Sequence, residues 1–268
     1  MTAATPVYDD IWRNVYGDLQ EHGPAHRHLR RLLRQTVAEL DFQTVLDVGC
    51  GTGDNLPMLL AGRSSARFVG ADVSKEALAR ARHRHPGHDF IALDIERQAL
   101  PDCFDLVFSS LVLEHLPNDE AALRNMHAMT GGRLVVATIG GDLHRYRPWE
   151  EQVGHVRNYR SGELERLLDR VGFEVERTLR WGFPFYSPIT RLLQNRMSAT
   201  PSYGGATRLV ARLTHAVYRL NSDRRGDLII IVARPWPASL RGLGSSPRAS
   251  GAEHSQVSPM RAQSRPPS

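Results

Sequence analysis

The chain has 268 residues, of which 41% are hydrophobic and 24% charged, as in a folded protein long enough for one large domain. Its two cysteines exclude a disulfide-stabilised scaffold and favour a reducing compartment, so we expect a cytoplasmic protein. The net charge of +5 does not require a nucleic-acid-binding fold, because residues 237–268 alone contribute +3 of it. We expect neither a secretion signal in the first 15 residues nor a membrane span.

The first 40 residues are predicted to start irregular and become helical. Tyr8, Trp12 and Tyr16 lie four residues apart, so they share one face of a short helix. A second helical stripe follows, formed by Leu29, Leu32, Leu33, Val37 and Leu40. The aromatic face has two interpretations, ordinary core packing or a lid over an apolar pocket. We assign residues 1–40 to an N-terminal helical lid.

From residue 45 onward, strand-like and helix-like segments alternate, which is typical of a parallel sheet covered by helices. The expected strands are residues 45–48, 67–71, 90–93, 104–109, 133–139, 173–179 and 227–233. One expected helix follows the glycine turn near residue 50 and ends near Gly62. The other expected helices cover residues 75–83, 118–129 and 161–171. Gly131 and Gly132 are predicted to separate a helix from a strand, and Ser161 to cap the last helix.

Three further segments fall outside this alternation. Residues 140–160 are predicted to form a polar and aromatic loop. Residues 185–222 are predicted to form two helices around a Pro-Ser-Tyr-Gly-Gly break at 201–205. Their apolar stripes and arginines fit a pocket cover first, and otherwise a dimer face or contact with a membrane surface or a lipid-linked acceptor. The tail after residue 237 is rich in Pro, Ser, Gly and Arg, and we expect it to be disordered.

The order of these elements predicts an α/β fold. We expect a doubly wound, mostly parallel seven-stranded sheet with helices on both faces. A helical insertion is expected between the sixth and seventh strands. The predicted organisation is therefore a lid (1–40), a central domain (41–236) that contains the insertion 185–222, and a tail (237–268).

The stretch from Val45 to Gly53 organises this domain. An apolar strand runs into three glycines at alternate positions, and a helix follows, an order that typically places a nucleotide-like cofactor across the turn. A dinucleotide site would require a third glycine three places after the second. The two registers place Asp54 or Leu56 there, so the dinucleotide pattern does not fit.

Four motifs in order resemble class I S-adenosylmethionine-dependent methyltransferases, of the methyltransferase type 11 kind found in bacterial natural-product and glycan pathways. They are Leu-Asp-Val-Gly-Cys-Gly-Thr-Gly at 46–53, Val-Gly-Ala-Asp-Val-Ser at 69–74, Leu-Asp-Ile at 93–95 and Phe-Asp-Leu-Val-Phe-Ser-Ser-Leu-Val-Leu-Glu-His-Leu at 104–116. The resemblance covers about residues 40–180. It implies the class I methyltransferase fold and S-adenosyl-L-methionine as the cofactor.

The resemblance also implies which residues hold the cofactor. Asp72 would bind both ribose hydroxyls, although a carboxylate there can also cap the following helix. Asp94 would lie near the adenine amino group with Ile95 on the ring, and Asp47 with the glycine backbone would hold the amino-acid end. The full set of expected cofactor-binding residues is Asp47, Gly49, Cys50, Gly51, Gly53, Asp72, Val73, Asp94, Ile95, Ser109 and Leu111.

Candidates for the methyl-transfer chemistry follow the fourth strand and lie in the 140–160 loop. Related quinone-pathway enzymes bind a metal through Glu, two residues, Glu, His, but here the first position is Leu111, so we expect no metal. Gly-His-Val-Arg-Asn-Tyr at 154–159 resembles an element of bacterial pathway methyltransferases. His155 is the candidate base, with a loop-fixing hydrogen bond as the alternative, and His115 and Tyr159 are further catalytic candidates.

The sequence therefore predicts a metal-independent methyltransferase that acts on an oxygen or nitrogen atom of a small metabolite, such as a sugar or a natural-product intermediate. The alternatives are methylation of RNA or protein, and a non-catalytic cofactor-binding partner protein. We expect a small-molecule acceptor and no nucleic-acid partner, because the charge surplus lies mostly in the tail. We expect no membrane span and at most surface contact with a membrane through residues 185–222. We expect the chain to be a monomer or a homodimer.

Overall fold

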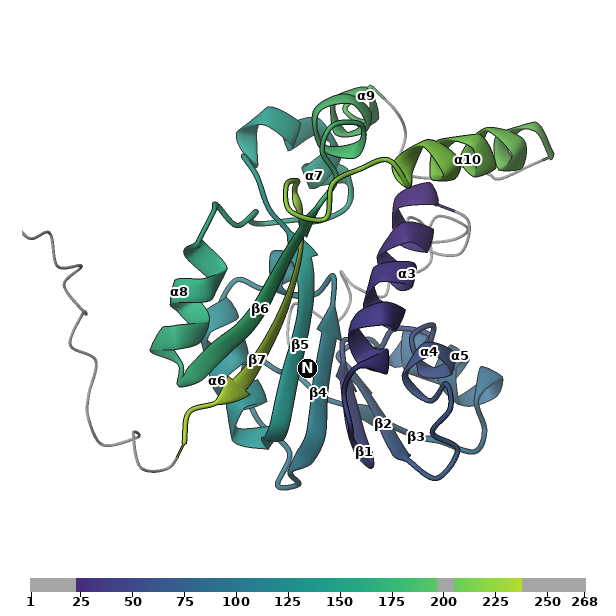
Figure 1. The fold of residues 1–268 in the computed structure, drawn as a ribbon. Coiled ribbons are helices and arrows are strands. Elements are labelled where there is room, and N and C mark those ends of the chain that lie inside the picture. Colours follow the sequence, from purple (N-terminus) through teal and green to yellow (C-terminus); the bar gives the residue numbers. More distant parts are fainter. Residues whose placement is uncertain (1–22, 197–204, 238–268) are drawn as a thin grey trace, which may run out of the picture.

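The computed structural model describes residues 23–196 and 205–237, which form a three-layer α/β domain (Figure 1). Its sheet has seven strands in the order β3-β2-β1-β4-β5-β7-β6. The first five strands along the chain are mutually parallel, and β7 runs antiparallel to both β5 and β6. The strands are β1 (Thr44–Val48), β2 (Arg67–Asp72), β3 (Asp89–Ala92), β4 (Phe104–Ser110), β5 (Thr130–Ile139), β6 (Phe173–Trp181) and β7 (Leu228–Pro235). The predicted fold class is confirmed.

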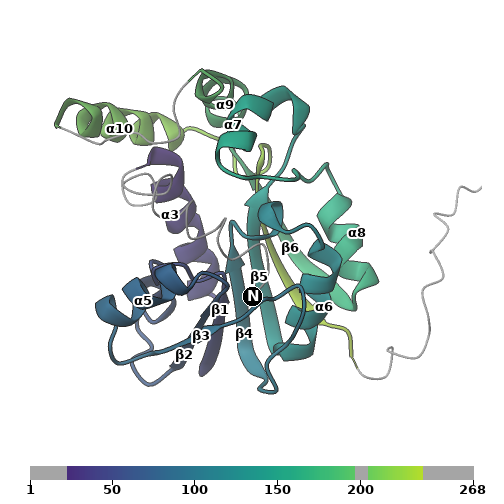
Figure 2. The ribbon, with the colours of Figure 1, turned by 180° about the vertical axis from the view of Figure 1, so that it is seen from behind.

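Helices cover both faces of this sheet. The α-helices are α3 (Pro24–Ala38), α4 (Leu56–Leu59), α5 (Lys75–Arg84), α6 (Asp119–Met129), α7 (Arg147–Gln152), α8 (Glu163–Arg170), α9 (Arg191–Gln194) and α10 (Gly205–Tyr218). The shorter turns are η1 (Leu113–His115), η2 (His144–Tyr146) and η3 (Tyr186–Thr190). Figures 1 and 2 place α3, α4 and α5 on one side of the sheet and α6 and α8 on the other.

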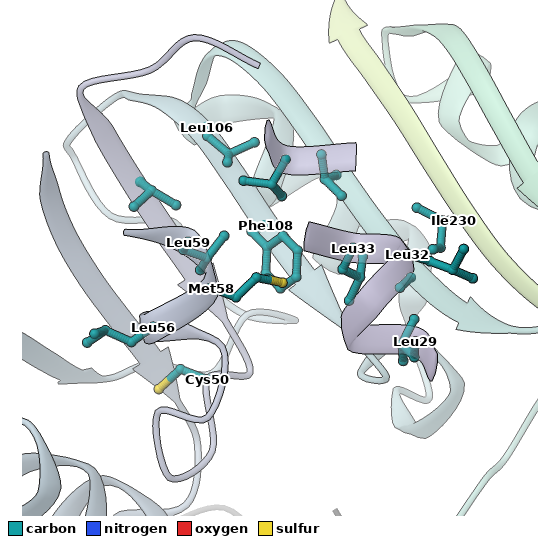
Figure 3. Close-up of a cluster of buried hydrophobic side chains, with 14 of the residues drawn as sticks. Leu29, Leu32, Leu33, Cys50, Leu56, Met58, Leu59, Leu106, Phe108 and Ile230 are labelled. Atoms are coloured by element: carbon teal, nitrogen blue, oxygen red, sulfur yellow. The ribbon is translucent and has the colours of Figure 1, made fainter. Parts of the chain in front are cut away.

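The central strands are buried on both faces, so their apolar residues alternate between two cores. In β1, Val45 joins the core under α3, α4 and α5, whereas Leu46 joins the core under α6 and α8. Figure 3 shows the first core, where Leu29 and Leu33 of α3 point towards Met58 of α4 and Phe108 of β4. The helical stripe predicted from residue 29 thus packs α3 across the sheet.

Three local predictions are wrong. Gly131 and Gly132 lie inside β5 instead of before it, beside an irregularity in the pairing of β4 with β5. Residues 140–160 contain η2 and α7, because Pro148 stands in the first turn of a short helix. The residue that caps α8 is Gly162 and not Ser161, because the chain enters this helix with a positive φ of 74°.

Some predictions concern residues outside the described ranges. The aromatic stripe of Tyr8, Trp12 and Tyr16, the break at 201–205 and most of the tail belong to this group, so the lid and the tail stay predictions. Within the described ranges, no helix is long and apolar enough to cross a membrane.

The close approach of β5 to β4 makes Gly132 a test of the sheet. A Cβ at Gly132 would lie 2.3 Å from the Asp105 carbonyl oxygen, whereas a Cβ at Gly131 would lie 3.4 Å from that of Phe104. We expect Gly132→Ala to destabilise the fold by about 1–3 kcal/mol because the strand must shift. Thermal unfolding should show a Tm loss of about 2–4 °C per kcal/mol. Gly131→Ala is the control, and equal losses in both variants would contradict this explanation.

Candidate functional site

A cavity of about 680 Å³ opens at the carboxyl edge of the parallel strands. It is bounded by the glycine turn after β1, the ends of β2 and β4, the start of α3, and residues of α9 and α10. A volume of this size suits a cofactor-sized ligand. The predicted residues that line it are Gly49, Cys50, Gly51, Asp72, Val73, Asp94, Ile95, Leu111, His115 and His155.

The glycine turn forms one wall of this cavity. Gly49, Gly51 and Gly53 all have positive φ, which costs glycine little and other residues more. A Cβ on Gly49 would also lie 2.2 Å from a Val112 methyl group, so no larger residue fits there without movement of the chain. The turn is held at the switch point of the sheet by the Gly49 amide, which donates to the Ala71 carbonyl oxygen at 2.7 Å.

Asp72 ends β2 at the edge of the cavity and is 8% exposed. One carboxylate oxygen accepts from the Gly51 amide and the other from the Ser74 amide, each at 2.8 Å. The cap of α5 is supplied by the Ser74 hydroxyl, which accepts from the Ala77 amide at 3.1 Å. Asp72 therefore supports the glycine turn and the turn before α5, and a carboxylate oxygen can accept more than one hydrogen bond.

The remaining cavity residues divide into polar and apolar positions. Asp94 follows β3 and pairs with Arg97 at 3.1 Å, while Ile95 is buried beside it. Leu111, after β4, has a φ of 57° and is the one non-glycine residue of the described ranges with positive φ. Strained backbone of this kind gathers at binding sites.

Three predicted cofactor residues do not line the cavity, namely Asp47, Gly53 and Ser109. Asp47 is fully buried behind the turn, where the Asn55 amide donates to one oxygen at 3.4 Å and the other oxygen has no partner among the described groups. Ser109 is buried with an unpartnered hydroxyl among the same residues. Asn55 does line the cavity, so Asp47 contacts the cavity lining only through its hydrogen bond with Asn55.

His155 also lines the cavity and is held by a buried carboxylate. Its Nδ1 forms a hydrogen bond with Glu150 of α7, which is 1% exposed. A carboxylate accepts, so Nδ1 is the donor, and the other ring nitrogen, Nε2, is the atom that can accept a proton from a ligand. Glu150 also pairs with Arg191 of α9. Burial by itself would raise the pKa of Glu150, but the hydrogen bonds and charges of His155 and Arg191 outweigh it and lower the pKa.

Arg191 connects three segments that are distant in the sequence. Its guanidinium donates to the Gly140 carbonyl oxygen and to Asp227, each at 2.8 Å, besides its pair with Glu150. It also lies 3.8 Å from the ring centroid of Tyr146. Arg191 thereby joins the helical insertion to the loop that carries His155.

His115 lies against His155, with ring centroids 4.7 Å apart. Its Nδ1 donates to the Gly154 carbonyl oxygen at 3.0 Å. Burial, followed by the nearby His155, lowers the pKa of His115 to about 3, so this ring is neutral near pH 7. Glu114 is buried below, where Thr138 donates to one oxygen at 2.8 Å and burial raises the pKa of the carboxyl group.

Glu114, His115 and His155 also offer the donor atoms of a metal site, since one ligand atom of each lies within 4.8 Å of the others. Both rings hold their Nδ1 protons on oxygen acceptors, as metal-binding histidines do. The same bonds serve a metal-free site equally well, because they fix the tautomer of a base. The expected absence of a metal stays a prediction.

Tyr159 does not reach the cavity. It is 2% exposed, and its hydroxyl donates to Asp119 at 2.7 Å. Burial, then the charge of Asp119, raises the pKa of this hydroxyl, so it is a poor proton donor or acceptor. The structure gives Tyr159 a structural position between the 140–160 loop and α6.

Sequence reasoning missed three polar residues of this region, His26, Glu150 and Arg191. His26 of α3 lines the cavity, and burial, then Arg30 and His155, lowers its pKa to about 4. Nothing in the spacing of these residues connects them, because their elements meet only in the folded chain. An arginine within an otherwise apolar turn at 189–193 was the one available signal.

The buried Asp47 predicts how stability depends on pH. Burial raises the pKa of Asp47 well above its ordinary range, to about 8. The fold therefore favours the protonated form, so the contribution of Asp47 to stability is fully present below about pH 4 and is lost as pH rises through about 8. Between about pH 5 and 8, we expect Tm to fall less in Asp47→Asn, which does not titrate, than in the unmodified protein. Parallel pH profiles of thermal unfolding would contradict the assignment.

Comparison with known proteins agrees with this geometry. Residues 46–136 match the family described as "Methyltransferase domain". A trans-aconitate 2-methyltransferase of Rhodopseudomonas palustris (strain BisA53) is 34% identical over 158 residues, which cover 54% of this chain and 59% of that protein. A tRNA U34 carboxymethyltransferase of Shewanella denitrificans is 38% identical over 137 residues, which cover 47% of this chain and 41% of that protein. The similarity thus spans about half the length of these relatives.

A solved structure adds evidence on the fold. The magnesium protoporphyrin IX methyltransferase of Synechocystis PCC 6803, with bound S-adenosylhomocysteine, aligns over 86% of this chain and 95% of its own, with a TM-score of 0.53 and 17% identity. The strand order, the glycine turn and the family match agree with the predicted recognition. Residues 46–136 therefore match a methyltransferase domain, and the strand order is that of the class I methyltransferase fold.

Proposed function

We propose that this protein is a cytoplasmic methyltransferase that transfers the methyl group of S-adenosylmethionine to an oxygen or nitrogen atom of a small molecule. The observation that carries the proposal is one cavity lined by two kinds of residue. The glycine turn and Asp72 are the residues expected of a cofactor site, and His115 and His155 line the same cavity.

The residues present fit this cofactor. Gly49 and Gly51 line the cavity with backbone atoms alone, Asp72 would offer its carboxylate to the ribose, and Ile95 would offer an apolar surface to the adenine ring. When bound, S-adenosylmethionine supplies a methyl group on a positively charged sulfur. The protein then has to hold the acceptor in line and keep its lone pair free.

His155 is suited to the second task. Its Nε2 can accept the proton that an acceptor hydroxyl or ammonium group loses, while Glu150 holds the ring through Nδ1 and stabilises the charged imidazolium. Arg191 keeps Glu150 ionised in a buried place. Glu150 and Arg191 are therefore positioning residues, and His155 is the proposed base.

Methylation of RNA is the second candidate, because one relative is named a tRNA carboxymethyltransferase. The other relative is named for a small acid, trans-aconitate. Several walls of the cavity are aliphatic, and the described ranges show no row of aromatic side chains for stacking bases along a basic groove. Labelled cofactor incubated separately with total tRNA and with a metabolite extract distinguishes the two, since label in tRNA alone would overturn the small-molecule assignment.

The cofactor assignment is tested by Asp72→Ala. Loss of its hydrogen bonds to a ligand should weaken S-adenosylmethionine binding by about 1.5–3 kcal/mol, roughly a 10- to 150-fold rise in Kd. Isothermal calorimetry measures this. Asp169→Ala on the exposed side of α8 is the matched control. Unchanged affinity in the Asp72 variant would refute the ribose assignment.

The proposed base is tested by His155→Ala and Glu150→Gln. We expect kcat to fall about 10²- to 10⁴-fold in the first variant, because the proton acceptor is lost. A smaller fall is expected in the second, because the ring remains but loses its carboxylate. Cofactor Kd should be unchanged in both. Steady-state kinetics and calorimetry give the two readouts.

His144→Ala serves as the control, since this exposed histidine of η2 lies in the same segment and does not line the cavity. Full activity of His155→Ala at every pH would make His155 a structural residue. Activity of the unmodified protein that a chelator removes and a divalent cation restores would instead assign the Glu114, His115 and His155 cluster to a metal.

A further inference from the structure

One side of α10 carries large apolar side chains that are mostly exposed. Leu209 and Leu213 are 59% and 61% exposed, Val210 and Val217 are 62% and 43% exposed, and Leu220, just beyond the last residue of α10, is 70% exposed. Spacings of three, four and seven residues place the four helical residues on one side of α10. Exposed patches of this kind mark interaction sites, because soluble surfaces seldom gather so many leucines and valines.

The same helix buries a different face. Ala211 and Tyr218 pack inwards, and Tyr218 lies edge-on to Trp181 with ring centroids 5.5 Å apart. His215 of α10 also lies beside His28 of α3, with centroids 5.6 Å apart. Hence α10 is fixed to the body by one face, and Figure 1 shows it extending away from the rest of the domain. Its leucine face points away from that packing.

The adjoining turn adds to this surface. Ile189, Leu192 and Leu193, in η3 and α9, are 50%, 39% and 51% exposed. We call these three residues, together with Leu209, Val210, Leu213, Val217 and Leu220, the insertion face. Every side chain of the insertion face is aliphatic, so this surface exposes only aliphatic groups to water.

Positive charge is concentrated in the segment that carries the insertion face. Residues 185–226 contain seven arginines and one acid, Asp223, so their net charge of +6 exceeds the +5 of the whole chain. Only Arg191 of these arginines is buried. Among the described residues, Arg212, Arg219 and Arg225 form no ion pair with a carboxylate. The expectation that the charge surplus lies mostly in the tail is therefore incomplete, because residues 1–184 and 227–236 carry a net charge of −4.

We propose that the insertion face docks on an anionic lipid bilayer. An aliphatic face flanked by arginines combines apolar insertion at the acyl boundary with attraction to lipid phosphates. A nucleic acid would use the arginines but leave the leucines in water. A second copy of this chain would bring two strongly basic surfaces together, which costs electrostatic free energy. The bilayer is the partner that satisfies both features.

Docking in this way would also select the methyl acceptor. Leu193 and Val210 belong to the insertion face and at the same time line the cavity. The mouth of the cavity beside α9 and α10 would then face the lipid, so the acceptor would be an apolar or lipid-anchored molecule. This second statement depends on the proposed function, whereas docking itself does not.

The experiment is co-sedimentation of the full chain with vesicles of phosphatidylcholine, with and without phosphatidylglycerol. We expect binding to the anionic vesicles that weakens as salt rises from about 0.1 to 1 M. Leu209→Gln with Leu213→Gln should weaken it at least about tenfold through lost apolar burial. Arg212→Gln with Arg219→Gln should reduce both binding and its salt dependence. These four residues do not line the cavity, so cofactor binding reports separately on the proposed function.

Matched controls are Ile91→Gln, an exposed apolar residue of β3, and Arg166→Gln with Arg170→Gln on α8. No binding to anionic vesicles would overturn the proposal. So would a dimer in light scattering that Leu209→Gln with Leu213→Gln dissolves, because a second copy would then cover the face. If the monomeric variant with Leu209→Gln and Leu213→Gln has a lower Tm than the unmodified protein, another part of the chain covers the insertion face. That result would also overturn the proposal.

Discussion

The whole site depends on the place where the sheet reverses its order, between β1 and β4. Chain connections leave this point in opposite directions, so the carboxyl ends of the strands open a crevice there. The glycine turn lies in that crevice and is tied to β2 by the Gly49–Ala71 and Gly51–Asp72 hydrogen bonds. Because these bonds are made by backbone amides, the turn is preformed for a ligand.

A second constraint shapes the cavity lining around His155. The buried guanidinium of Arg191 has two carboxylates and a backbone carbonyl around it, which compensates for the loss of water. It brings the insertion, the end of β7 and the loop of His155 to one point. The orientation of the proposed base is therefore coupled to the helical insertion, the segment proposed to select the acceptor. A substitution in the insertion can change catalysis without touching the acceptor.

The insertion also differs from the rest of the domain in charge and apolar exposure. Residues 1–184 and 227–236 carry a net charge of −4, and the α/β core buries its aliphatic residues on both faces of the sheet, whereas residues 185–226 carry +6 and expose many of theirs. This contrast is the basis of the proposal that the insertion has an external partner. In that proposal the core holds the cofactor and the insertion selects the acceptor.

The sequence by itself determined the strands between residues 44 and 181, the fold class and the match to a methyltransferase domain, because alternating elements and a glycine turn are local patterns. It missed α7, the place of Gly132 and the cap of α8, where neighbouring strands and backbone geometry override local propensity. Only the tertiary structure brought Glu150, His155 and Arg191 together and placed Tyr159 on Asp119 instead of in the cavity. These contacts join residues 5 to 41 positions apart, and no periodicity encodes them.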